Sequence, residues 1–67
     1  MTAQSDINPP PAMSLDELGS NLYAVRSSLK SMKAAADKMH RLRLALELAI
    51  MLETMEQAIE VFEEENK

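Results

Sequence analysis

The residues with catalytic side chains are few and widely separated along this chain. His40 is the single imidazole, and the serines nearest to it are Ser27, Ser28 and Ser31. A nucleophilic serine needs a general base within hydrogen-bonding distance, oriented by a third group. No such acid–base–nucleophile spacing surrounds His40, and the serines lie in an amphipathic segment that offers no substrate pocket. We therefore expect no enzymatic activity.

Four glutamates could act as metal ligands, because intervals of three and four residues place them on one face of a helix. They are Glu53, Glu56, Glu60 and Glu63. Helical bundles that bind two metal ions combine such glutamates with a Glu-x-x-His motif, which this sequence lacks. With one His and no Cys, a structural zinc site is also disfavoured. We interpret the glutamates as a solvated acidic face and expect neither a metal nor a cofactor.

A basic segment, residues 26–43, contains six of the seven Lys and Arg residues. Its positive charges could contact phosphates, which would suit a small DNA-associated regulator. However, no aromatic residues are interleaved with the basic ones, and no motif for reading bases is present. The net charge of −4 also opposes binding to polyanions. Nucleic acid is therefore a less favoured partner than protein.

The most apolar stretch is RLRLALELAIMLETM, residues 41–55. Its longest uninterrupted apolar run extends from Leu48 to Leu52, between Glu47 and Glu53. A helix that spans a membrane needs roughly 20 apolar residues, so we expect no membrane insertion. The N-terminal MTAQSDINPPP lacks the basic and apolar regions of a signal peptide, and we expect a cytoplasmic location.

The size and composition of the chain predict an all-α fold. Ala, Leu, Glu and Met are frequent, whereas Gly, Tyr and Phe occur once each and Trp is absent. The frequent residues favour helices, and the scarcity of aromatic residues disfavours a sheet. Residues 1–13 contain Pro9, Pro10 and Pro11 and are expected to form a flexible arm. Residues 14–66 are expected to form a single helical domain.

The first helix has a clear predicted start at Ser14, with Glu17 three residues later in the pattern of a capping box. From this point apolar residues recur at alternating intervals of three and four, as in a helix that packs against one other helix. The pattern stops after Met39 and resumes five residues later at Leu44. The predicted intramolecular seam consists of Leu15, Leu18, Leu22, Val25, Leu29 and Met32 on the first helix and Leu44, Leu48, Leu52, Ile59 and Phe62 on the second.

The break in this pattern has two interpretations. The favoured one is an antiparallel helical hairpin of residues 14–36 and 40–64, with Asp37 as a candidate N-cap of the second helix. The alternative is one long helix in a coiled coil with a local discontinuity. The alternative stays open because no Gly or Pro follows Gly19 to mark a turn.

The second helix is apolar on more sides than one hairpin partner can cover. In its first half, little beyond Arg43, Glu47 and Thr54 is polar. A helix that is apolar nearly all round is expected to be buried nearly all round. We therefore predict a homodimer in the form of a four-helix bundle, or a complex with a partner helix. The predicted partner interface consists of Leu42, Leu46, Ala49 and Ile50, together with the adaptable methionines Met39, Met51 and Met55.

These features favour a small non-enzymatic protein–protein interaction module with an amphipathic helical groove, such as an adaptor, a co-chaperone or a regulator-binding protein. The segment LETMEQAIEVF, residues 52–62, resembles part of the small hairpin co-chaperones of type III secretion needle subunits. The resemblance implies a co-chaperone whose partner is a needle subunit. A coiled-coil structural spacer is a further alternative.

Overall fold

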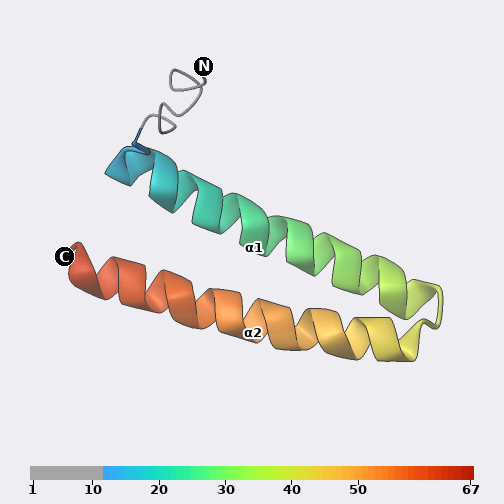
Figure 1. Ribbon diagram of the computed structural model, residues 1–67. Helices are drawn as coiled ribbons and strands as arrows, with labels where there is room; N and C mark the ends of the chain where they lie inside the picture. The colour runs from blue at the N-terminus through green and yellow to red at the C-terminus, as the bar shows by residue number, and fades with distance from the viewer. Residues whose placement is uncertain (1–11) are drawn as a thin grey trace, which may run out of the picture.

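The fold is a hairpin of two long helices. The computed structural model describes residues 12–67, and residues 1–11 of the predicted arm lie outside this range. Helix α1 comprises Leu15–Lys38 and helix α2 comprises Leu42–Glu65, with 24 residues in each. The two helices pack side by side and run in opposite directions (Figure 1). The all-α hairpin predicted from the sequence is therefore confirmed, and the single long helix is excluded.

Helix α1 begins with a complete capping box. The backbone N–H of Glu17 donates to Ser14 Oγ at 3.1 Å, and the backbone N–H of Ser14 donates to Glu17 Oε1 at 2.9 Å. Each residue thereby supplies an acceptor to a backbone donor that has no partner within the helix. The hydrogen bonds from the Ser14 backbone and side chain lower the pKa of Glu17 below its usual value.

The turn between the helices is a Schellman motif, in which two hydrogen bonds close the end of α1. The N–H of His40 donates to the carbonyl of Asp37 at 3.1 Å, and the N–H of Arg41 donates to the carbonyl of Ala36 at 2.9 Å. His40 has a φ of 58°, in the left-handed region that glycine usually occupies.

Asp37 does not cap the second helix, so that part of the sequence prediction is wrong. Asp37 lies within α1, where its Oδ2 accepts from Lys33 Nζ at 2.9 Å. The N-cap of α2 is Arg41, whose side chain makes no capping hydrogen bond. Helix α1 continues past Asp37 to Lys38 before the Schellman motif ends it, which leaves the chain only three residues in which to reverse.

The helices meet along a seam made of two rows, one on each helix, whose members recur every three or four residues. The buried hydrophobic residues of the seam are Leu29, Ala36, Ala45, Leu48 and Ile59. Arg26 and Lys33 are half-buried in the same row of α1, so their aliphatic stems help to cover α2. The full seam consists of Gly19, Leu22, Arg26, Leu29, Lys33 and Ala36 on α1 and Ala45, Leu48, Leu52, Met55, Ile59 and Phe62 on α2.

This seam shares only part of the predicted one. Six of the predicted seam residues are buried or half-buried in the observed seam, and they are Leu22, Leu29, Leu48, Leu52, Ile59 and Phe62. The other five predicted members of the seam are 40–57% exposed, and they are Leu15, Leu18, Val25, Met32 and Leu44. The apolar stripe of α1 is wider than the strip that α2 covers, because α2 approaches from one side of the stripe. The other side of the stripe is left at the surface.

At the end of the hairpin opposite the turn, side-chain contacts join the two helices. A Cβ placed on Gly19 would lie 3.1 Å from the ring of Phe62, so the absence of a side chain lets the ring approach α1. One helical turn further along α1, the Tyr23 hydroxyl donates to Glu63 Oε2. The guanidinium of Arg26 lies over the Tyr23 ring, 5.3 Å from its centroid, within the range of a cation–π interaction.

Candidate protein-binding groove

An apolar groove runs along one side of the seam. Its walls are two rows of exposed side chains, each with a spacing of seven residues, which is about two helical turns. Members of both rows line the same two hollows, so the rows lie on the same side of the seam. We call this surface the groove and define its walls as Leu18, Val25, Met32 and Met39 on α1 and Leu44, Met51 and Ala58 on α2.

Two hollows in the surface lie within this groove. The hollow nearer the turn has Leu48 at its base, and the hollow in the middle of the hairpin has Leu29 at its base; both leucines are buried. Each hollow is large enough to admit a side chain from a docked helix. The first is lined by Met32, Ala35, Ala36, Met39, Arg41, Leu44 and Leu48, and the second by Val25, Leu29, Ile50, Met51, Thr54, Met55 and Ala58.

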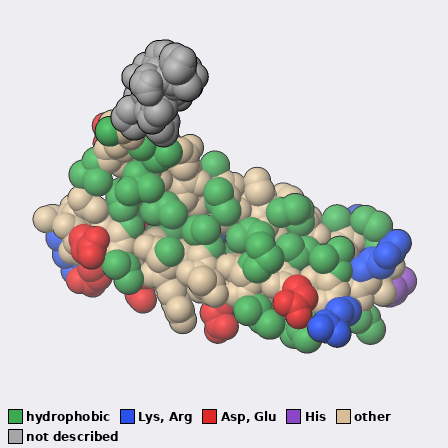
Figure 2. Space-filling view, viewed as in Figure 1, with side chains coloured by type: hydrophobic (Ala, Val, Ile, Leu, Met, Phe, Trp, Pro, Cys, Tyr) green, Lys and Arg blue, Asp and Glu red, His purple; other side chains and the backbone are tan. Residues whose placement is uncertain are grey.

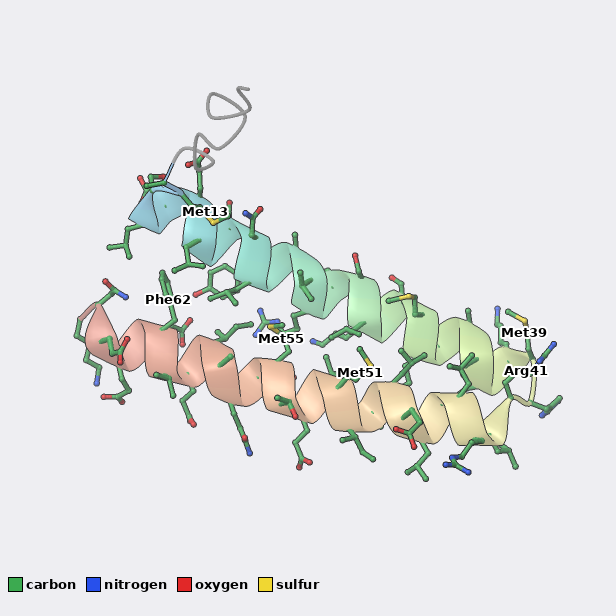
Figure 3. The ribbon with its side chains drawn as sticks, in the orientation of Figure 1. Met13, Met39, Arg41, Met51, Met55 and Phe62 are labelled. Atoms are coloured by element: carbon green, nitrogen blue, oxygen red, sulfur yellow. The ribbon has the colours of Figure 1, made fainter. Side chains whose placement is uncertain are left out.

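Methionines contribute much of the groove surface. Figure 3 shows Met51 and Met55 extending from α2 toward α1, and Met39 at the turn. Figure 2 shows hydrophobic side chains spread along the length of both helices on the face in view. Methionine side chains are unbranched and polarizable, so they adapt their shape to different partners. The groove is therefore apolar and adaptable in shape.

The residues predicted for the partner interface divide between two surfaces. Met39, Met51 and Met55 line the groove. Ala49 is half-buried. Leu42, Leu46 and Ile50 are exposed at intervals of four residues on α2, and we call these three the outer stripe. Ile50 also lines the second hollow, so the two surfaces meet at this residue. The outer stripe covers only two turns of one helix, with Glu53 and Glu56 beyond it.

The candidate catalytic and metal-binding residues are not assembled into a site. His40 lies exposed in the turn, and Ser27, Ser28 and Ser31 are exposed on α1. Within residues 12–67, no three His, Cys, Asp or Glu side chains are close enough to hold a metal ion. Among the basic residues near the turn, Lys33 and Arg43 pair with Asp37 and Glu47.

The sequence prediction placed Met39, Met51 and Met55 at a partner interface but assigned Leu18, Val25, Met32 and Leu44 of the groove walls to the intramolecular seam. A clue was available in α2, where Met51 and Ala58 continue the spacing of Leu44. Neither α1 nor α2 has an apolar stretch of the length needed to cross a membrane. No protein family, curated protein or solved structure matches the chain.

Proposed function

We propose that the protein is a small interaction module that binds an amphipathic helix in the groove. One observation carries the proposal: each helix leaves a row of apolar side chains exposed, and members of both rows line the same two hollows. A contiguous apolar surface that is exposed to water commonly marks a site where another molecule binds. The groove therefore suits a partner that adds apolar area along its whole length.

The shape of the groove supports a helix as the partner. A third helix laid against two others places residues at intervals of three and four over the space between them. The wall rows repeat every seven residues, so a partner helix with a heptad pattern matches their period. The two hollows would receive its larger side chains. Such binding suits an adaptor, a regulator-binding protein or a co-chaperone that covers an exposed amphipathic helix.

Site-specific photo-cross-linking tests this proposal. A photoreactive amino acid replaces Met32 in the groove wall, and the matched control replaces Ser27 on the same helix. Both positions are exposed, but a five-residue offset places them about 140° apart around the helix. Cross-linking in the cells that produce the protein is expected to yield protein adducts from position 32 and few from position 27.

The adducts are then identified by mass spectrometry of the cross-linked peptides. Peptides from an amphipathic helix, of this chain or of another protein, support the proposal. Equal adduct formation from both positions contradicts it, because the reactive surface would then not be the groove. Absence of adducts from position 32 contradicts it as well.

A further inference from the structure

The two ends of the hairpin carry an excess of charge of opposite sign. At the turn end, Lys38, Arg41 and Arg43 lie together, since the end of α1 and the start of α2 are adjacent. At the opposite end, the acidic first turn of α1, with Asp16 and Glu17, is adjacent to the acidic last turn of α2. Arg43 pairs with Glu47 and Lys67 pairs with Glu64, but basic residues remain in excess at the turn end and acidic residues at the open end.

The charges of α2 also oppose its own helix dipole. A helix favours acidic residues in its first turn and basic residues in its last turn. Helix α1 follows this rule, with Asp16 and Glu17 at its start and Lys38 at its end. Helix α2 has no acidic residue in its first turn and no basic residue in its last turn. The charges at its two ends therefore destabilise the isolated helix. Opposite charges from another chain, placed near these ends, would stabilise it.

We infer that the occupant of the groove is a second copy of this chain, docked face to face and antiparallel. In this arrangement the turn end of each copy lies over the open end of the other. The basic turn thereby meets the acidic helix ends of the second copy at both ends of the assembly. The inference rests on the groove proposed above as a binding surface and specifies its partner.

The apolar rows are compatible with this two-fold arrangement. If the two-fold axis passes midway between Val25 and Met32 on α1, then Val25 of one copy faces Met32 of the other. Because Gly19 lies level with Phe62, the same axis crosses α2 near Leu52, so the two Met51 side chains lie close to one another. On α1 the larger Met32 thus faces the smaller Val25, which favours interdigitation across the interface. The product is an antiparallel four-helix bundle in which the groove walls become the core.

The charges discriminate between this arrangement and its parallel counterpart. Rotation of the second copy about an axis along the helices would also place groove against groove. The two turns would then lie side by side, and so would the two acidic ends. Like charges in contact oppose association and unlike charges favour it. The antiparallel dimer is also expected to weaken as salt rises, because exposed charges are screened over roughly 10 Å at 0.1 M ionic strength.

Sedimentation of the full chain tests the partner. Met51→Glu places a charge in the groove, and Leu46→Glu is its matched control in the outer stripe of the same helix. The two side chains are similarly exposed, at 53% and 57%. Met51→Glu is expected to raise the dimer dissociation constant by at least about 100-fold, since each dimer buries two Met51 side chains. Leu46→Glu is expected to leave the dissociation constant nearly unchanged.

Circular dichroism of both variants separates lost association from lost folding, since a folded monomer retains its helix signal. Three results overturn the inference. The first is a folded wild-type chain that sediments as a monomer at the highest soluble concentration. The second is dissociation by Leu46→Glu but not by Met51→Glu. The third is equal dissociation by both variants.

Spin labels test the orientation, and the absence of cysteine makes each label unique. In the antiparallel dimer, labels on Lys38→Cys lie at opposite ends, about 30 Å apart along the bundle from a rise of 1.5 Å per residue. Labels on Ser28→Cys, close to the proposed axis, lie near one another and serve as the control. A short distance between labels at position 38 overturns the antiparallel arrangement.

The inference and the proposed function fail by different results. If the chain is monomeric in sedimentation but position 32 cross-links to a helix of another protein, the homodimer is rejected and the helix-binding groove is supported. If a dimer forms through the outer stripe and position 32 gives no adducts, both the homodimer through the groove and the helix-binding groove are rejected. A dimer with the predicted label distances supports both.

Discussion

The two ends of the hairpin are held together in different ways. At the turn end, covalent connection and the Schellman hydrogen bonds of His40 and Arg41 bring the helices together. At the open end, the helices are joined by side chains, through Phe62 against Gly19 and Tyr23 against Glu63. The start of α1 is capped by Ser14, whereas the start of α2, at the turn, has no side-chain cap.

The difference between the two ends indicates which contacts stabilise such a small fold. A covalent turn keeps the helices close whatever their side chains are, so the turn can tolerate an unfavourable residue at position 40. The open end has no such connection and depends on specific contacts. Substitutions at the turn end should therefore change mainly the local backbone and the packing beneath it. Substitutions at the open end should let the helix termini separate.

The largest effect is expected from Leu48→Ala, beneath the turn end. Leu48 is 7% exposed and belongs to the main cluster of buried residues, so its truncation should lower the free energy of unfolding by about 2–5 kcal/mol. Phe62→Ala at the open end should lower it by about 1–3 kcal/mol, because its ring is only half-buried. Chemical denaturation at one fixed protein concentration measures both. A larger loss for Phe62→Ala would place the main core at the open end.

The next effect concerns the helix cap at the open end. Ser14→Ala removes the acceptor for the Glu17 backbone N–H and should lower the free energy of unfolding by about 0.5–2 kcal/mol. Ser14→Asp retains an acceptor and is the control. Because folding lowers the pKa of Glu17, its contribution is present above the usual pKa and is lost as pH falls through the folded value. Equal stability of the alanine variant and the wild type would contradict the cap.

A smaller effect of opposite sign is expected at the turn. His40→Gly removes the steric strain of a left-handed residue with a Cβ, about 1–2 kcal/mol. Glycine also gives the unfolded chain more freedom, so the net gain should be about 0.5–1 kcal/mol. Thermal denaturation should show a higher midpoint for His40→Gly and a lower one for Lys38→Gly, whose backbone is helical. A loss of stability in His40→Gly would show that the imidazole makes an essential contact.

The smallest effect is a titration at the open end. The hydrogen bond to Glu63, with the negative charge of that carboxylate, raises the pKa of Tyr23 above 10.0. The contribution of this contact is therefore present below the ordinary pKa and is lost as pH rises through the folded pKa. Tyr23 is the only tyrosine and there is no tryptophan, so ultraviolet absorbance follows its ionisation directly. Glu63→Gln should lower the pKa of Tyr23, and an unchanged titration would contradict the contact.

The sequence predicted those features that depend on local residue types. The capping pattern at Ser14 and Glu17 requires only residues three positions apart, and α1 begins there. The hairpin followed from the break in the apolar pattern after Met39. The position of the turn was less accessible, because a Schellman motif usually has glycine where this chain has His40. Asp37 was misassigned for the same reason.

The division of apolar residues between the seam and the groove could not be read from periodicity. Two strips lie side by side on α1, one with Leu22, Leu29 and Ala36, the other with Val25 and Met32. The pattern shows that both strips are apolar, but it does not show which of them faces α2. Arg26 and Lys33 complete the observed seam, and no rule based on apolar spacing selects such residues. Their long aliphatic stems explain the choice only once the packing is known.

The two helices differ in capping and in terminal charges, and this difference affects the order in which they fold. Helix α1 has its own cap and charges that agree with its dipole, whereas α2 has neither. A short helix in water is marginal without such local support. We therefore expect α1 to form first during synthesis and to act as a template on which α2 becomes helical. A peptide of residues 12–40 should accordingly be more helical in circular dichroism than one of residues 41–67.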